Sequence, residues 1–189
     1  MMEFINKSTI KLDKAINELD KFAFDFCRIL GKHTKYVVIS GYVAILFGRS
    51  RATEDVDIFI EKLGRERFYS LYEELKKNGY ECITADSETA FENLNQDIPI
   101  RFAKKKRFIP NIEVKFAKKD IDKKSLTENL KVVTHFGHIY TSLIEPQIAF
   151  KRVCLGSEKD IEDALHLEKV FEGRIDKNKI KRYERLFRK

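Results

Sequence analysis

Residues 36–61, YVVISGYVAILFGRSRATEDVDIFIE, decide the fold that the sequence predicts. The segment begins with an apolar strand over residues 36–39, followed by a tight turn at Ser40-Gly41 and a short apolar helix over residues 42–47. A basic loop then leads into a second strand, which carries the acidic pair of the motif DVD. The segment therefore predicts two strands joined by a turn and a helix, with acidic side chains on the second strand.

The acidic pair predicts a charged site. Side chains alternate across a strand, so Asp55 and Asp57 share one face and the apolar residues between and after them share the other. Two adjacent carboxylates repel each other and lose solvation, a cost that a divalent cation between them relieves, and oxygen ligands suit magnesium. The Ser40-Gly41 turn ahead of a helix offers backbone N–H groups to an anion. Together the two features predict a site for a metal-bound triphosphate, although surface acids and a glycine placed for steric reasons would produce the same letters.

The same segment resembles the nucleotidyltransferase superfamily (DNA polymerase beta-like fold), whose mark is a Gly-Gly or Gly-Ser turn followed, after a short gap, by Asp-x-Asp. The string Arg51-x-Thr53-x-Asp55-x-Asp57 looks most like the AbiEii-type and related minimal nucleotidyltransferases, some of which are parts of toxin–antitoxin pairs. This chain departs from the family pattern at one position, because Ser40 stands where the first glycine is expected.

That family needs a third carboxylate on a neighbouring strand. Residues 111–116 (NIEVKF) alternate, so that Glu113 and Lys115 lie opposite the apolar side chains. The resemblance implies that Glu113 completes the metal site or helps to deprotonate the attacking hydroxyl. The alternative interpretation is that Glu113 is only a cross-strand partner for a lysine. Asp97 is the second candidate for the third acid. It is the weaker one, because Gln96-Asp97 is typical of a turn.

The C-terminal part resembles the family more loosely, through Glu145-Pro146, Lys151 and the run KDIED over residues 159–163. The resemblance implies that Lys151 approaches the triphosphate as a point charge. The alternative is a surface lysine beside Arg152. Asp160 and Asp163 fall in a first helical turn, where acids stabilise a helix by facing its dipole.

The rest of the chain predicts an α/β or α+β fold, a small mixed sheet flanked by helices. Residues 1–120 are expected to form the sheet domain with an N-terminal helix, and residues 121–189 a mainly helical region packed on it. Apolar spacing predicts helices from Leu12 to a stop at Gly31 and from Phe68 to Gly79, and further helices over residues 146–154, 157–173 and from 176 onward. Strands are expected over residues 80–84, 99–103 and 107–116, the last two paired around the Lys104-Lys105-Lys106 turn. A hairpin tip is expected at 135–138, while residues 86–95 fit a helix or a loop.

Three details of these elements are explicit predictions. Pro110 argues that its strand lies at an edge or contains a bulge. The helix after Ser157 is expected to bury Ile161, Ala164, Leu165 and Phe171. The last helix is expected to bury Ile180, Tyr183, Leu186 and Phe187.

Composition bounds the setting. A hydrophobic content of 43% with 15 Phe excludes wholesale disorder. The longest apolar stretch, residues 36–48, is too short to span a bilayer, so no membrane partner is expected. The three cysteines, Cys27, Cys82 and Cys154, are odd in number and far apart, which supports neither disulfides nor a zinc site and favours a reducing cytoplasm.

A net charge of +7 favours polyanionic partners, although 35% charged residues of both signs is also typical of heat-adapted surfaces. Basic residues gather in the Lys104-Lys105-Lys106 turn and in the final helix, at Lys177, Lys181, Arg182, Arg185, Arg188 and Lys189. We therefore expect a macromolecular acceptor, either RNA (tRNA among the candidates) or a partner protein. The sequence predicts nothing about oligomeric state.

The resemblance implies a reaction in which an acceptor hydroxyl attacks the α-phosphate of an NTP. Asp55, Asp57 and Glu113 would hold Mg²⁺ or Mn²⁺ and carry catalysis. Ser40, Gly41, Arg51 and Lys151 would bind the nucleotide, with Arg49 adding positive potential. Two alternatives remain: an inactive, antitoxin-like relative that binds nucleotide or a protein, and a basic RNA-binding protein whose acids are incidental.

Overall fold

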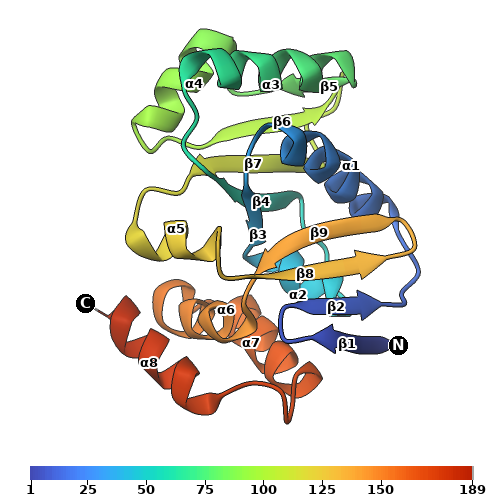
Figure 1. The fold of residues 1–189 in the computed structure, drawn as a ribbon, viewed down its shortest axis with the longest axis vertical. Coiled ribbons are helices and arrows are strands. Elements are labelled where there is room, and N and C mark those ends of the chain that lie inside the picture. Colours follow the sequence, from blue (N-terminus) through green and yellow to red (C-terminus); the bar gives the residue numbers. More distant parts are fainter. Residues whose placement is uncertain (189) are drawn as a thin grey trace.

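A single mixed β-sheet runs the length of the molecule in a computed structural model that describes residues 1–188 (Figure 1). Within these residues nine strands pair in the order β1-β2-β8-β9-β3-β4-β7-β6-β5. The strands are β1 (Met2–Asn6), β2 (Thr9–Leu12), β3 (Tyr36–Ile39), β4 (Asp55–Ile60), β5 (Tyr80–Cys82), β6 (Ile100–Lys104), β7 (Asn111–Phe116), β8 (Asn129–Thr134) and β9 (Gly137–Ser142). The predicted mixed sheet flanked by helices is confirmed.

The predicted central unit is present at the middle of this sheet. Strand β3 is followed by helix α2 (Gly41–Leu46) and by β4, which pairs antiparallel with β3 and parallel with β7. Along β4 the buried side chains are Val56, Ile58 and Ile60, as alternation predicts. Pairing with β3 on one side and β7 on the other places the acidic residues of β4 in the interior of the sheet.

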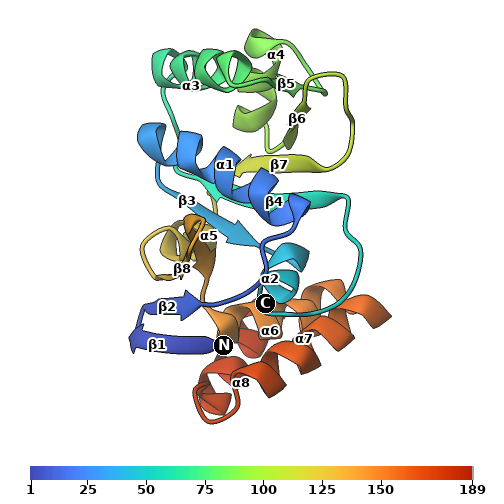
Figure 2. The same ribbon diagram turned by 90° about the vertical axis from the view of Figure 1, so that its right-hand side faces the viewer.

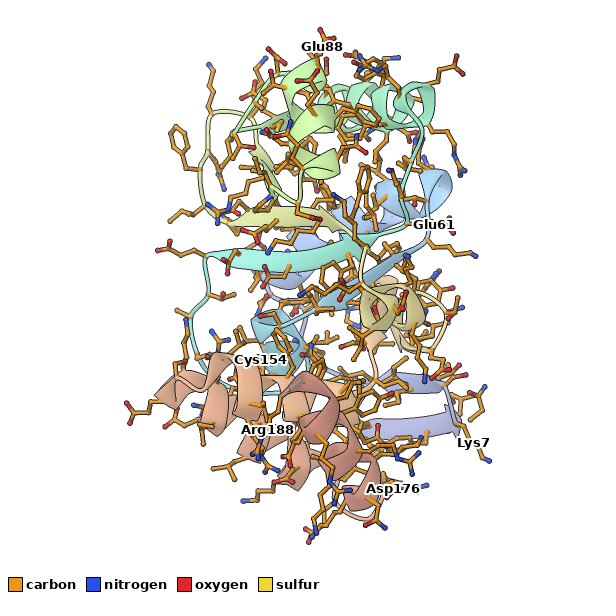
Figure 3. All side chains as sticks on the ribbon, turned by 90° about the vertical axis from the view of Figure 1, so that its left-hand side faces the viewer. Lys7, Glu61, Glu88, Cys154, Asp176 and Arg188 are labelled. Atoms are coloured by element: carbon orange, nitrogen blue, oxygen red, sulfur yellow. The ribbon has the colours of Figure 1, made fainter. Side chains whose placement is uncertain are left out.

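Helices cover one face of this central region. Helix α1 (Glu18–His33) packs on β3, β9 and helix α3 (Arg65–Lys77), and α4 (Ser87–Asn95) packs on β6, β7 and α3. Figure 2 shows α1 crossing in front of β4 and β7. From the opposite side, β4 and β7 lie in front of these helices, with Glu61 just beyond the end of β4 (Figure 3). The face of β4 and β7 that bears the acids is therefore the one away from α1.

The N-terminal part differs from the prediction. Leu12 belongs to strand β2 of a β1–β2 hairpin, and the helix starts only at Glu18. Asn17 sets this start, because its side chain accepts the Asp20 backbone N–H while the Asp20 carboxylate accepts the N–H of Asn17. Gly31 does not end the helix either, since helical geometry continues to His33 and Thr34 caps it by donating its N–H to the Leu30 carbonyl.

The expectation that Pro110 lies in an edge strand or at a bulge is also wrong, because β7 is an interior strand with an unbroken register. Strand β7 begins at Asn111, after Pro110, and lies between β4 and β6. The proline therefore removes no ladder hydrogen bond. Residues 86–95, whose pattern fits either a helix or a loop, are mostly helical in α4, whose start is capped by the Asp86 side chain accepting the Thr89 N–H.

After α5 (Asp120–Ser125), the chain returns to the sheet before it becomes helical. Strands β8 and β9 form a hairpin whose turn lies where the sequence places it, and the hairpin pairs with β2 and β3. Helix α6 (Ile144–Phe150) continues into a π-helical turn, η1 (Lys151–Leu155), which ends at Gly156 with a φ of 65°. Helices α7 (Glu158–Val170) and α8 (Lys177–Phe187) lie with α6 at the lower end of the molecule in Figure 1, beside β1 and β2.

The buried faces of the last two helices differ from those predicted. In α7 the side chains of Ile161 and Leu165 are 36% and 55% exposed, whereas Asp160 and Asp163 are buried with Ala164 and Leu167. The acids displace the apolar residues from the inner face because the buried cation Lys151 pairs with them there. In α8, Ile180 is buried, Tyr183 and Phe187 are partly buried, and Leu186 is 53% exposed. Lys189 of the basic C-terminal run lies outside the described residues.

Candidate active site

Three predicted acids lie together on the face of the sheet away from α1. Asp57 is directly opposite Glu113 in the parallel pairing of β4 with β7, and Asp55 is opposite Asn111. Asp55 and Asp57 are partly exposed, whereas Glu113 is only 6% exposed. The strand register thus brings together the acids that the sequence assigns to one site.

Asp57 is electrostatically strained in this position. Burial raises the pKa of its carboxyl, and the neighbouring charges of Asp55 and Glu113 raise it further. Ser40 and Lys115 act in the opposite direction without overcoming this effect. Within residues 1–188 no lysine or arginine forms an ion pair with Asp57 or Asp55. Asp57 is therefore a carboxylate that lacks a cation.

Glu113 has the opposite environment. Arg101 of β6 donates from Nε and Nη2 to Oε2 at 3.0 and 2.6 Å, and Lys115 Nζ lies 2.5 Å from Oε1. Burial by itself would raise the pKa of Glu113, but hydrogen bonds from Lys115 and Arg101 outweigh burial and lower it. Both oxygens of Glu113 are thus already neutralised by cations from the protein.

These environments decide how the acids fit a divalent cation. Asp55 and Asp57 fit one well, because a cation between them would relieve the repulsion that raises the pKa of Asp57. Glu113 could join them only after Arg101 or Lys115 released an oxygen. In agreement with this, no group of three or more His, Cys, Asp or Glu in the described part of the chain is arranged to hold a metal ion.

The Ser40-Gly41 turn lies at the end of β3, next to the acids, because Ile39 pairs with Asp57. Ser40 has φ 64° and ψ −139°, a backbone conformation that favours glycine. Gly41 opens helix α2, and a Cβ atom at this position would collide with the Arg51 guanidinium. Gly41 is therefore required for the close approach of Arg51, which brings a positive charge to the turn.

Arg51 is held by a buried ionic network that connects the β4 side of the site to the C-terminal helices. Its Nε and Nη2 donate to the two oxygens of Asp163 at 3.0 and 2.9 Å. Lys151, which is fully buried, donates to Asp163 at 2.8 Å and to Asp160 at 3.1 Å. Burial would raise the pKa of Asp163, but the hydrogen bonds from Arg51 and Lys151 lower it. Arg49 adds ion pairs with Glu162 and Asp163.

The residues assigned to nucleotide binding differ in burial, although Arg51 and Lys151 share the Asp163 carboxylate. Ser40, Gly41 and Arg51 lie together at the turn, whereas Lys151 contacts Asp160 and Asp163 in the protein interior. Asp97, the second candidate for the third acid, lies beyond the C-terminal end of β7, away from Asp55, where it pairs with Lys118 at 2.9 Å. Sequence reasoning missed Arg101. The predicted pairing of residues 99–103 with residues 107–116 is confirmed, but the sequence does not fix the register in which Arg101 lies opposite Glu113.

Comparison with solved structures agrees with this fold. The chain is similar to a lincosamide antibiotic adenylyltransferase, LnuA, with lincomycin bound (TM-score 0.54, 12% identity, covering 83% of this chain and 99% of that one). It is also similar to an antigenic nucleotidyltransferase-like protein from Paracoccidioides brasiliensis (TM-score 0.55, 15% identity, covering 88% of this chain and 86% of that one). The fold of this chain is thus the fold seen in structures of nucleotidyltransferases.

No family model matches the sequence, and no curated protein matches it. Among the helices that the structure describes, none combines the length and the apolar character needed to cross a membrane.

Proposed function

We propose that this chain is a nucleotidyltransferase that moves a nucleoside monophosphate from an NTP to a hydroxyl group with the help of a divalent cation. One observation carries the proposal. Asp57 lies beside Asp55 and opposite Glu113, with a raised pKa and no ion-pair partner within the described residues. It is next to the Ser40-Gly41 turn, against which the Arg51 guanidinium lies. The shared fold with a lincosamide adenylyltransferase supports the same class of reaction.

In this reaction the acceptor oxygen forms a bond to the α-phosphorus of the NTP. The bond from that phosphorus to the oxygen bridging to the β-phosphate breaks, and pyrophosphate leaves with the electron pair. The acceptor proton passes to a base. Glu113 is the proposed base, and its paired state makes it available only after Lys115 or Arg101 moves aside, for example toward an incoming phosphate.

Asp55 and Asp57 would hold Mg²⁺ or Mn²⁺, which supplies positive charge for the reacting phosphates when it is bound. The Thr53 hydroxyl donates to Asp55 Oδ1 at 3.1 Å and so orients this carboxylate. Glu113 would be the third ligand in the alternative arrangement, in which Arg101 or Lys115 releases one of its oxygens. In this proposal Asp55 and Asp57 of β4 would bind the metal, and Arg101 of β6 and Lys115 of β7 would determine whether Glu113 is free to join them.

Ser40, Gly41 and Arg51 would bind the β- and γ-phosphates. The Arg51 guanidinium lies against the turn, so that an anion bound there meets both backbone N–H groups and a fixed positive charge. Lys151 would act through its neighbours, because it holds Asp163 and Asp163 holds Arg51. This assigns Lys151 a positioning role rather than contact with phosphate.

The acceptor would be a macromolecule, either RNA or a partner protein, because the chain carries a net charge of +7. An AbiEii-type assignment and a place in a toxin–antitoxin pair rest on the Arg51-x-Thr53-x-Asp55-x-Asp57 string alone. Tests of the acceptor should therefore include the protein encoded next to this chain as well as total RNA.

A second function is favoured by one specific observation. Glu113 is neutralised by Arg101 and Lys115, which is also what a relative without turnover would show. Such a protein would bind NTP through Asp55 and Asp57 and transfer nothing.

Incubation with Mg²⁺ or Mn²⁺, each of the four labelled NTPs, and either total RNA or the neighbouring protein distinguishes the two functions. Label transferred to a macromolecule establishes the transferase. Metal-dependent NTP binding without transfer establishes the inactive binding module. Absence of metal-dependent NTP binding, measured by calorimetry, overturns both.

A further inference from the structure

The loop between β6 and β7 (residues 105–110, hereafter the β6–β7 loop) combines basic and apolar side chains that lie in solvent. Lys105, Lys106 and Arg107 are exposed. Phe108 is 75% exposed and Ile109 is 54% exposed. Phe108 is the most exposed aromatic side chain among the large hydrophobic residues in the described part of the chain. Two adjacent, exposed apolar side chains beside three cations form a mixed apolar and basic surface, of the kind that can mark an interaction site.

Two carboxylates lie near this loop: Glu81 accepts the Lys106 backbone N–H at 3.4 Å, and the pKa of Glu18 is lowered mainly by Lys21 and to a smaller extent by Arg107. No carboxylate within the described residues forms an ion pair with Lys105, Lys106 or Arg107, whereas Arg101 and Lys115 on the adjoining strands are paired with Glu113. Unpaired surface cations retain their full attraction for an anion that arrives from outside. The side-chain cations of the loop are therefore less neutralised than those of Arg101 and Lys115 on the adjoining strands.

The loop is held in place at the edge of the candidate active site. The Asn111 side-chain amide donates to the Phe108 carbonyl at 3.4 Å and to the Glu54 carbonyl at 3.3 Å. The Asn111 backbone N–H donates to Glu54 as well, at 2.8 Å, and Asn111 is the register partner of Asp55. On its other side the loop is fixed by the Lys105 N–H, which donates to the Gly79 carbonyl at 2.9 Å.

Its position follows from the strand directions. Strands β4 and β7 are parallel and begin at Asp55 and Asn111, so the loop that precedes Asn111 lies at the end of β4 that carries the acidic pair. Figure 3 shows this end of the sheet on the side away from Glu61, which follows the other end of β4. The β6–β7 loop thus lies at the same strand end as Asp55 and Asp57.

We propose that the β6–β7 loop docks a single-stranded segment of RNA, with Phe108 stacking on an unpaired base and Lys105, Lys106 and Arg107 contacting phosphates. Aromatic side chains beside basic residues are the means by which proteins hold unpaired nucleic acid, because every base has a π-face. A duplex presents no free base face to Phe108. This inference rests on the proposed function and deepens it, because it names single-stranded RNA as the acceptor.

The test measures binding without turnover. Fluorescence anisotropy of the full chain is followed with a labelled RNA oligonucleotide of about 12 nucleotides, near the upper range for one such site. EDTA is present and NTP is absent. The same RNA annealed to its complement is the second ligand. We expect the single strand to bind more tightly than the duplex.

Two variants separate stacking from charge. Phe108→Ala should weaken single-strand binding by about 5- to 150-fold, as removal of one stacking aromatic side chain does. Phe108→Trp keeps an aromatic ring and should bind single strands as the wild type does. The triple variant Lys105→Gln, Lys106→Gln, Arg107→Gln should lower the slope of log affinity against log salt by about 0.7 for each phosphate that the protein no longer neutralises.

Matched controls come from elsewhere on the surface. Phe136→Ala removes another exposed aromatic, at the β8–β9 turn, and the triple variant Lys177→Gln, Lys181→Gln, Arg185→Gln removes the same charge from α8. Neither control should change single-strand binding by more than about twofold, since each lies outside the β6–β7 loop. An equal decrease in affinity in both triple variants would show that net charge alone binds RNA and would overturn the assignment.

The outcomes also distinguish the loop from the proposed function. If RNA binds as expected and no nucleotide is transferred either to RNA or to the neighbouring protein, the loop assignment stands and the transferase falls. If nucleotide is transferred while Phe108→Ala binds single strands as wild type does, the loop assignment falls and the transferase stands. Binding to an acidic protein without binding to RNA would overturn the loop assignment.

Discussion

Asp57 and Glu113 face each other across β4 and β7, and their pKa values are shifted in opposite directions. Asp57 has neighbouring carboxylates and no cation, whereas Glu113 has two cations from the protein itself. Groups whose environments push their pKa values apart are typical of acid–base and metal sites. Substitution of either acid should therefore change stability and activity in different ways.

Replacing Asp57 by Asn should raise the stability of the metal-free protein at neutral pH. Because the folded-state pKa of Asp57 is raised, its ionisation destabilises the fold as pH rises through that pKa, and removing the charge removes the cost. The melting temperature should rise by about 2–4 °C for each kcal/mol recovered. The same variant should lose the stabilisation that Mg²⁺ with NTP produces.

Thermal denaturation at pH 7 with and without Mg²⁺ and NTP measures both effects. Glu54→Asn, which changes an exposed acid two residues before Val56, is the control and should leave both unchanged. Unchanged metal-plus-NTP stabilisation in Asp57→Asn would contradict the metal assignment.

Replacing Glu113 by Gln should lower turnover more than NTP affinity, because a group that takes the acceptor proton acts mainly in the transition state. Removal of a general base costs on the order of a hundred- to ten-thousand-fold in rate. Single-turnover transfer from labelled NTP gives the rate, and calorimetry gives the affinity. A wild-type rate would mean that the third acid lies elsewhere, with Asp97 the next residue to change.

Acid sensitivity of the fold should depend on Glu113. Its folded-state pKa is lowered, so its pairing stabilises the protein above the ordinary carboxyl pKa of about 4.3 and is lost as pH falls through the folded value. In Arg101→Gln the Glu113 pKa should move up, and part of this stabilisation should disappear. Urea unfolding at pH 7 and at about pH 4 should therefore show a smaller difference for Arg101→Gln than for the wild type. An unchanged difference would mean that Lys115 alone sets the Glu113 environment.

Lys151 should matter to stability far more than its neighbour. Lys151→Met leaves Asp160 and Asp163 buried with one cation fewer, and breaking a buried ion pair costs about 3–5 kcal/mol. Arg152→Met removes a partly exposed cation that pairs with Glu168 and Glu184, and should cost about 1 kcal/mol or less. Urea denaturation of the two variants makes the comparison.

A double variant shows whether the cost in Lys151→Met comes from the stranded acids. Asp163 keeps Arg51 when Lys151 is removed, whereas Asp160 keeps only the Ser157 hydroxyl. Adding Asp160→Asn to Lys151→Met should therefore recover part of the stability. Equal stability of the single and double variants would assign the destabilisation to packing instead.

The sequence predicts the centre of this fold well because the signals there are local. Alternation over residues 55–60 and 111–116 places the acids on one face, and the Ser40-Gly41 turn marks the end of β3. The pairing of Asp57 with Glu113 can be anticipated because the family resemblance implies a third acid on a neighbouring strand. The contact of Arg101 with Glu113 cannot, since the predicted pairing of residues 99–103 with residues 107–116 does not fix the register, and Ala103 lies opposite Asn111 across a longer loop than the predicted turn at residues 104–106.

Elsewhere, tertiary contacts overrule the local pattern. Leu12 satisfies the spacing of a helix and of a strand, and pairing of β2 with β1, in which Leu12 lies opposite Met2, decides for the strand. Ile161 and Leu165 have helical spacing, but α7 turns Asp160 and Asp163 inward to meet buried Lys151. A pattern that assumes apolar residues inside and charged residues outside reverses where the partner charge is itself buried.

Replacing Ser40 by Gly should stabilise the protein and test whether serine limits the site. Ser40 holds φ 64° and ψ −139°, where a side chain costs on the order of 1–3 kcal/mol and glycine avoids that cost. The entropy of glycine in the unfolded chain offsets about 0.5–1 kcal/mol of this gain, so a net gain of about 1 kcal/mol is expected in urea unfolding. Ser40→Ala is the matched control, because it keeps the strain and removes only the hydroxyl, and it should show no gain. Since Ser40 also lowers the pKa of Asp57, both variants should raise that pKa further. When the pH is lowered, metal-dependent NTP binding should therefore be lost at a higher pH in both variants than in the wild type. A Ser40→Gly protein no more stable than Ser40→Ala would show that the backbone at this turn relaxes without glycine, and that the serine here costs the fold nothing.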